Sequence, residues 1–334
     1  MFLIKKIGNF TQIFNKTILQ ANLMSNYYHK LLKKNPFILA PMDDVTDIAF
    51  REICEDAGAS YSTTELTSVD ALIRDKVPLS RYQRGNLKRN QVQLFGCDPD
   101  TFVKAAKYVN SEADSIDVNF GCPSGTVTGN NSGAMLLKDP KNVGQIIEKL
   151  VKNVDKPISA KIRLGYKKTT YSEVAKEIED AGAELLAVHG RTAEQKYSGK
   201  ANWDAIKEIY QKVEIPLVGN GDIRNEEDID SYLNKYSDAL MIGRAAIGNP
   251  MIFKQFNHYY NQKEKLEFDR KIIQKKLFVE YINKLGKYEF RNENIKIQRQ
   301  GMWFMKGIEG AKELRKDLVQ MKERDKIIQR VNEF

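Results

Sequence analysis

Short apolar runs recur along the middle of the chain, and each is followed by a stretch with the periodicity of an amphipathic helix. Eight such runs are predicted to be strands: 37–40, 60–64, 92–95, 115–119, 158–163, 185–189, 217–220 and 239–242. The helical stretches between them include 47–57, 101–109, 143–154, 172–181, 204–212 and 226–232. Gly58 and Gly182 follow two of these helices, at the place where glycine commonly ends a helix. This alternation predicts an α/β fold, a parallel (β/α)₈ TIM barrel, and not an open doubly wound sheet.

The strand pattern stops after Pro250, and helices are expected at 271–285, 295–306 and 311–331. The predicted domains are therefore a TIM-barrel domain at 36–250 and a small all-α domain at 251–334. Residues 1–35 form a basic N-terminal extension, and its first two dozen residues place apolar side chains near helical spacing among lysines. This leader suits a transit peptide or a surface-binding helix, and we expect it to be dispensable.

Charge is distributed unevenly over these segments. The formal net charge of the 334 residues is +9, with about +6 on residues 1–35, −5 on 36–250 and +8 on 251–334. A basic tail behind an acidic barrel indicates a polyanionic partner, although solvated helix faces give the same excess.

Composition also excludes several classes of protein. No apolar run approaches the ~18 residues that cross a bilayer, so no membrane partner is expected. Three cysteines in a long chain form no disulfide framework, which favours a reducing, cytoplasmic location. With three histidines and no cluster at ligand spacing, no metal site is expected. No Ser, His and Asp fall into the order of a hydrolytic triad.

Polar residues end nearly every predicted strand, and in a TIM barrel the strand ends form the active site. The seventh and eighth strands end in Asn220-Gly221-Asp222 and Gly243-Arg244. Glycines at these two ends let backbone N–H groups approach a phosphate, and an arginine completes the site. The pair of motifs predicts phosphate binding.

A cysteine and two basic side chains follow the central strands. Cys122 comes directly after the fourth strand, whereas Cys54 and Cys97 are expected to be structural. A thiol that is protonated at neutral pH can donate a proton during a reduction. Lys161 and His189 end neighbouring strands, where they can stabilise negative charge on a reduced cofactor ring.

Several motifs together resemble the tRNA-dihydrouridine synthase family. They are Ala40-Pro-Met42, Gln93-Leu-Phe-Gly96, Asn119-Phe-Gly-Cys-Pro123 with Gly133-Ala-Met-Leu-Leu137, Lys161-Ile-Arg163, His189-Gly-Arg-Thr192 with Tyr197-Ser-Gly199 and Trp203-Asp204, Asn220-Gly-Asp-Ile223 and Gly243-Arg244. The match covers about 36–250 and continues more weakly into the tail.

The resemblance implies an FMN enzyme that reduces the C5–C6 double bond of uridines in tRNA with electrons from NADPH. It places the flavin ring on Pro41, Met42 and Asp43, held by Gln93, Lys161 and His189. It places the flavin phosphate against Asn220, Gly221, Asp222, Gly243 and Arg244. Cys122 would protonate C5, with Asn119 and Arg163 near the uracil. The basic tail would bind tRNA, with help from a loop that carries Arg74, Lys76, Arg81, Arg84, Lys88 and Arg89.

The chain departs from the family pattern at three places: Ser124-Gly-Thr126, Ala193 and Arg299-Gln300 stand where basic residues or a histidine are common. Two rival functions stay open. One is an FMN barrel that acts on a free pyrimidine, like a dihydroorotate or dihydropyrimidine dehydrogenase. The other is a non-catalytic barrel that binds RNA or a phosphorylated ligand.

Overall fold

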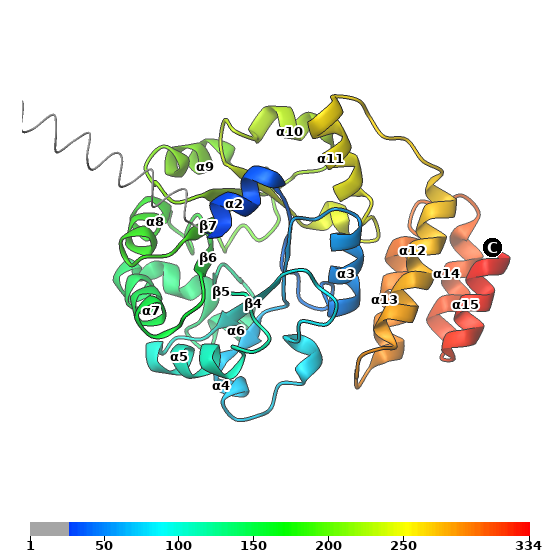
Figure 1. Ribbon diagram of the computed structural model, residues 1–334, viewed down its shortest axis with the longest axis horizontal. Coiled ribbons are helices and arrows are strands. Elements are labelled where there is room, and N and C mark those ends of the chain that lie inside the picture. Colours follow the sequence, from blue (N-terminus) through cyan, green and yellow to red (C-terminus); the bar gives the residue numbers. More distant parts are fainter. Residues whose placement is uncertain (1–26) are drawn as a thin grey trace, which may run out of the picture.

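The computed structural model describes residues 27–334, and the expectation for residues 1–26 lies outside this range. Eight parallel strands close into a barrel, since β1 pairs with both β2 and β9, and β2 also pairs with β4. Around the ring they are β1 (Phe37–Leu39), β2 (Ser62–Thr63), β4 (Asn90–Phe95), β5 (Ser115–Phe120), β6 (Ile158–Arg163), β7 (Leu185–His189), β8 (Leu217–Asn220) and β9 (Ala239–Ile242). A short strand, β3 (Thr67–Ser68), extends the pairing beside β4. The predicted TIM barrel is confirmed (Figure 1).

Helices surround the strands and bury their outer face. They are α3 (Ile48–Asp56), α4 (Val69–Leu72), α5 (Pro99–Tyr108), α7 (Pro140–Asn153), α8 (Tyr171–Asp180), α9 (Trp203–Tyr210), α10 (Glu226–Tyr232) and α11 (Ile252–Gln262). Short helical turns, α6 (Gly125–Thr128), η1 (Leu79–Arg81), η2 (Gly133–Lys138) and η3 (Arg244–Ala246), lie in the loops. Asp47, Asp98 and Asp139 accept hydrogen bonds from the first turns of α3, α5 and α7, which fixes where these helices begin.

The bottom of the barrel is closed by α2 (Tyr27–Lys34), which crosses the opening of the strand ring in Figure 1. Tyr28, Leu31 and Leu32 of this helix pack against side chains that point inward from the strands, such as Ile38 and Val218. The opposite end of the barrel stays open, so a site forms there.

Four further helices form a bundle beside α3: α12 (Arg270–Leu285), α13 (Glu293–Phe304), α14 (Ala311–Gln320) and α15 (Arg324–Glu333) (Figure 1). The single helix predicted at 311–331 is wrong, because the chain turns after Gln320. Gln298 of α13 donates to the carbonyl oxygens of Val319 (2.9 Å) and Met321 (3.0 Å). These bonds satisfy the end of α14, and α15 then packs back on α12.

The bundle docks on the barrel through α3. Phe304 makes an edge contact with Phe50, and the Tyr281 hydroxyl donates to Asp47 at 2.8 Å. By contrast α11, which follows the domain boundary predicted at residue 250, packs on β1 of the barrel. None of the helices in the described part of the chain is both long and apolar enough to cross a membrane.

Candidate active site

A cavity of about 830 Å³ opens at the carboxyl ends of the strands. All fourteen residues expected at the site line it: Pro41, Met42, Asp43, Gln93, Asn119, Cys122, Lys161, Arg163, His189, Asn220, Gly221, Asp222, Gly243 and Arg244. The volume lies within the range of small-ligand and cofactor sites. The barrel therefore brings the predicted residues together, although their roles remain predictions.

Cys122 lies on the cavity wall and not in the packed interior. The side chain of Asn119 accepts from the backbone N–H groups of Gly121 (3.0 Å) and Cys122 (2.8 Å), so the last inward residue of β5 fixes the turn that carries the thiol. Partial burial raises the pKa of the Cys122 thiol, and only weaker effects oppose it. The sulfur therefore carries a proton at neutral pH. Cys54 is fully buried, as expected, and Cys97 is exposed outside the cavity.

Lys161 presents an ammonium group without a partner. Between residues 27 and 334 no side chain or backbone group forms a hydrogen bond or ion pair with its Nζ atom. Burial and the nearby charge of Arg163 lower the pKa of Lys161 to about 8. The Lys161 ammonium group is therefore free to bind a hydrogen-bond acceptor or an anion in the cavity.

His189 is a neutral imidazole with a defined tautomer. Burial, together with the charges of Lys161 and Arg163, lowers its pKa well below the ordinary value. Its Nε2 atom lies 3.2 Å from Nη1 of Arg191. Because a guanidinium only donates, Nε2 accepts and the ring proton sits on Nδ1. His189 thus acts as a hydrogen-bond donor and not as a cation.

The loops after β8 and β9 form the cationic end of the cavity. Gly221 has a φ of +129°, and a Cβ there would lie 2.7 Å from the Cβ of Ala201. Arg244 begins η3 and is half-exposed to the cavity. The carboxylate of Asp222 accepts from Arg244 at 2.9 Å and from Arg191 at 2.6 Å. Asp222 therefore holds two arginines in place. The guanidinium of Arg244 and the backbone at Gly221 both line the cavity, where they can bind an anion.

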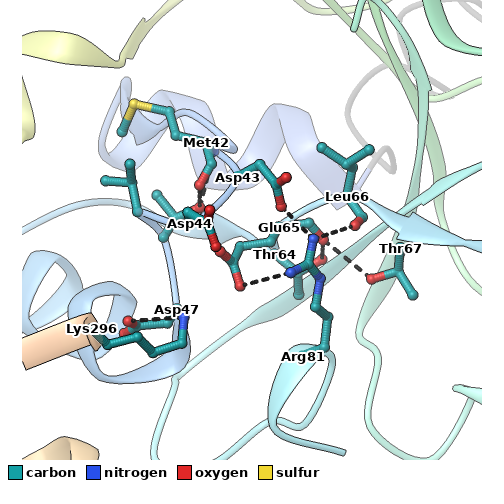
Figure 2. A network of polar contacts seen from close by, with 12 residues as sticks. Met42, Asp43, Asp44, Asp47, Thr64, Glu65, Leu66, Thr67, Arg81 and Lys296 are labelled. Atoms are coloured by element: carbon teal, nitrogen blue, oxygen red, sulfur yellow. Dashed lines mark hydrogen bonds and ion pairs between the residues drawn. The ribbon is translucent and has the colours of Figure 1, made fainter. Parts of the chain in front are cut away.

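The loop after β1 is held from two sides (Figure 2). Arg81 forms an ion pair with Asp43, lies 3.6 Å from Glu65 and donates to the Leu66 carbonyl at 3.0 Å. The Asp43 carboxylate, expected beside the flavin ring, is thus engaged with Arg81.

The second hold comes from helix α13. Arg299 pairs with Asp44 at 3.0 Å, and the Gln300 amide donates to the Val45 carbonyl at 3.0 Å. Lys296 lies 3.6 Å from Asp47, and Figure 2 shows these two side chains facing each other. The helical bundle therefore contacts the segment that forms one wall of the cavity. Gln300 supplies one of these contacts.

Two residues of the site had no role predicted from the sequence. Tyr197 lines the cavity with 58 % of its surface exposed, and the guanidiniums of Arg244 and Arg163 lie 4.8 Å and 5.6 Å from its ring centre. Arg191 is 1 % exposed behind His189. Tyr197 lies in a loop without periodic pattern, and although the motif Tyr197-Ser-Gly199 contributes to the family resemblance, it assigned no role to this side chain.

The basic loop expected to meet RNA is partly neutralised within the protein. Arg84 pairs with Asp114 at 2.5 Å, and Arg81 is held as described above. In the range that the structure covers, no three His, Cys, Asp or Glu side chains are placed to hold a metal ion.

Comparison with known proteins decides the family. The family model described as "Dihydrouridine synthase (Dus)" matches residues 38–334. The chain belongs to the dihydrouridine synthase family. A probable tRNA-dihydrouridine synthase of Aquifex aeolicus is 33 % identical over 90 % of this chain and 96 % of its own length. The tRNA-dihydrouridine synthase B of Pasteurella multocida is 35 % identical over 83 % and 85 %.

A solved structure, an old yellow enzyme homologue from Zymomonas mobilis, aligns with a TM-score of 0.49 and 14 % identity over 70 % of this chain and 90 % of that chain. Membership of the dihydrouridine synthase family confirms an enzyme of the predicted class, a flavin-dependent oxidoreductase.

Proposed function

We propose that this dihydrouridine synthase reduces the C5–C6 double bond of uridines in tRNA, with FMN as cofactor, NADPH as the source of electrons and Cys122 as proton donor. The observation that carries the proposal is the position of the Cys122 thiol, which shares one cavity with the unpartnered Lys161 ammonium and with Arg244. The relatives named as tRNA-dihydrouridine synthases support the substrate class.

The residues present suit a phosphorylated flavin. Gly221, Gly243 and Arg244 would bind the phosphate, because all three line the cavity and the two glycines have no side chain between their backbone and a ligand. Lys161, Gln93 and the Nδ1–H of His189 would bind acceptor atoms of the ring. When bound, the flavin supplies a hydride to C6 of the pyrimidine, after its own reduction by NADPH.

Cys122 supplies the second hydrogen as a proton. Its Sγ atom holds the proton at neutral pH and would transfer it to C5, so that the S–H bond breaks as the C5–H bond forms. The thiolate left behind lies near the positive charges of Arg163 and Lys161, which favour it. Water then returns a proton to the sulfur. Asn119 holds the Cys122 backbone throughout this step.

The helical bundle offers a surface for the RNA. Lys271, Lys275 and Lys276 of α12 line a groove of about 360 Å³, and none of them pairs with a carboxylate of residues 27–334. Phosphates of a folded RNA would be neutralised there while the target base enters the barrel, as a flipped base must. A free pyrimidine has no phosphates and would not bind to this surface.

The proposal is tested with purified protein and tRNA that lacks dihydrouridine. The preparation should be yellow and release FMN on denaturation, identified by mass spectrometry. With NADPH, dihydrouridine should form in the tRNA, while uracil and orotate stay unchanged. A colourless protein that FMN does not reconstitute, or reduction of the free base alone, would overturn the proposal. A cytoplasmic location stays a prediction.

A further inference from the structure

A chain of buried polar side chains runs through the barrel beneath the cavity. TIM-barrel interiors are usually filled by bulky apolar side chains, as they are here on β1, β7, β8 and β9. The inward positions of β4, β5 and β6 are instead polar. From top to bottom it comprises Asn119, Gln93, Asp117, Ser159 and Gln91, all of them buried.

In the upper half of this series of side chains, the hydrogen bonds can run in only one direction. Two backbone N–H groups donate to Asn119 Oδ1, so its other atom, Nδ2, is the donor. Nδ2 donates to Gln93 Oε1 at 2.8 Å. Nε2 of Gln93 must then donate, and it does so to Asp117 Oδ2 at 2.7 Å. Every donor from the Cys122 turn downward points toward Asp117.

The lower half runs in the opposite sense. The Thr63 hydroxyl donates to Gln91 Oε1 at 2.7 Å, which makes Nε2 of Gln91 the donor. This nitrogen donates to Ser159 Oγ (3.0 Å) and to the Tyr28 hydroxyl of α2 (2.7 Å). Ser159 in turn donates to Asp117 Oδ1 at 2.6 Å. Donors therefore converge on both oxygens of Asp117.

With Gln93 and Ser159 both donating, each oxygen of Asp117 acts as an acceptor, as in an ionised carboxylate. Burial raises the pKa of Asp117, but the hydrogen bonds from Ser159 and Gln93 and the charge of Lys161 oppose this effect.

We propose that Asp117 is a positioning residue of this active site: as a carboxylate it orients the Gln93 and Asn119 amides, and it is the countercharge that keeps Lys161 protonated. The proposal rests on the proposed function, in which Cys122 is the proton donor and Lys161 binds the flavin ring. Asp117 does not line the cavity and so acts through these neighbours.

Lys161 faces charged and titratable groups on three strands. In the register of β5 and β6, Asp117 pairs with Ser159 and Asn119 pairs with Lys161, so Asp117 and Lys161 occupy successive inward positions on neighbouring strands. Arg163 on the same strand and its pairing partner His189 on β7 both lie close to Lys161, and the Cys122 thiol follows β5. Among these groups Arg163 opposes the ammonium, and Asp117 is the fully buried carboxylate that favours it. Without that negative charge the neutral amine would prevail at lower pH.

Asp117→Asn separates the charge from the hydrogen bonds. The amide keeps an oxygen for Gln93 and offers a donor to Ser159, whose hydroxyl can turn to the Ile116 carbonyl, 3.5 Å away. Ser159→Ala is the matched control, because it removes one donor to Asp117 while the carboxyl group and its hydrogen bond from Gln93 remain.

The experiment measures the titration of Lys161 in flavin-free protein. Acetic anhydride labels neutral amines, so the labelling of Lys161 from pH 5 to 10, quantified by mass spectrometry, reports its protonation. We expect a midpoint near pH 8 in the wild type, about one pH unit lower in Asp117→Asn and little changed in Ser159→Ala. In the tRNA assay, lowering the pH by one unit should restore much of the activity of Asp117→Asn.

An unchanged midpoint in Asp117→Asn, or the same shift in Ser159→Ala, would overturn the proposal. The labelling needs neither flavin nor tRNA, so its failure is distinct from a failure of the proposed function, which the flavin content and tRNA assay report. Should Asp117→Asn not fold, an atomic-resolution crystal structure of the wild type decides: equal C–O bond lengths support an ionised Asp117, and unequal lengths contradict it.

Discussion

Arg191 donates to the carboxylate of Asp222 at 2.6 Å, and this contact joins a buried cation to the wall of the cavity. Arg191 also donates to Nε2 of His189, so the same guanidinium fixes the tautomer of the imidazole. Asp222 is 21 % exposed and is shared with Arg244. One carboxylate thus holds the arginine behind the site and the arginine that faces an anion.

Asp222→Ala should therefore weaken both folding and cofactor binding. Removing one partner of a buried pair leaves an uncompensated charge, and we expect a loss of about 2 to 3 kcal/mol in the free energy of unfolding. FMN affinity should also fall, because Arg244 loses its anchor. Urea unfolding and fluorescence titration with FMN measure the two effects.

The control for this prediction is Asp180→Ala. Asp180 forms an exposed pair with Lys176, and its loss should change stability by at most about 0.5 kcal/mol. Equal stability of the two variants would contradict the role given to Asp222.

Activity should fall at alkaline pH. Lys161 acts as a cation and Cys122 as an acid, so both must be protonated. Burial lowers the pKa of Lys161 to about 8 and raises that of Cys122. The value of kcat/KM for tRNA should therefore be level below pH 7 and decline through about pH 8, approaching tenfold per unit. A rate that rises between pH 7 and 9 would contradict this assignment.

The groove on α12 should bind RNA through charge. Reversing Lys271, Lys275 and Lys276 to Glu should weaken tRNA binding and reduce the slope of log affinity against log salt concentration by about 2 to 3. Flavin content should not change, because these side chains lie outside the cavity. Filter binding at several salt concentrations gives the slope.

A charge-matched control is available on the far side of the barrel. Lys104 and Lys107 of α5 and Lys141 of α7 are exposed, and these helices lie away from the bundle in Figure 1. Their reversal to Glu changes the net charge equally and should leave the salt slope largely intact. Equal losses in both triple variants would indicate a general charge effect.

The barrel and its site were predictable because both depend on local patterns. Short strands that alternate with amphipathic helices form a repeating local pattern, and the closed topology brings every strand end to one rim. Lys161 and Arg244 could thus be assigned to one site although 83 positions separate them in the sequence. The turn between α14 and α15 was missed because neither glycine nor proline marks it; a side chain of α13 supplies the stop.

Contacts between loops could not be predicted from the sequence, because they do not depend on a local pattern. The pairing of Asp43 with Arg81 follows from how two loops fold over the rim, and no periodicity encodes it. The direction of the hydrogen bonds toward Asp117 likewise needs the register of three strands. No pattern in the sequence indicated that these polar residues form one hydrogen-bonded chain inside the barrel.

The central claim is that the Cys122 thiol delivers the proton to the pyrimidine. Its most direct test compares Cys122→Ala with Cys97→Ala, a control outside the cavity. Two rates are measured in each: reduction of bound flavin by NADPH under anaerobic conditions, and dihydrouridine formation in tRNA. Loss of a general acid costs about 100-fold or more. The account predicts that Cys122→Ala keeps the first rate and loses the second by at least that factor, and dihydrouridine formation at the wild-type rate in Cys122→Ala would contradict it.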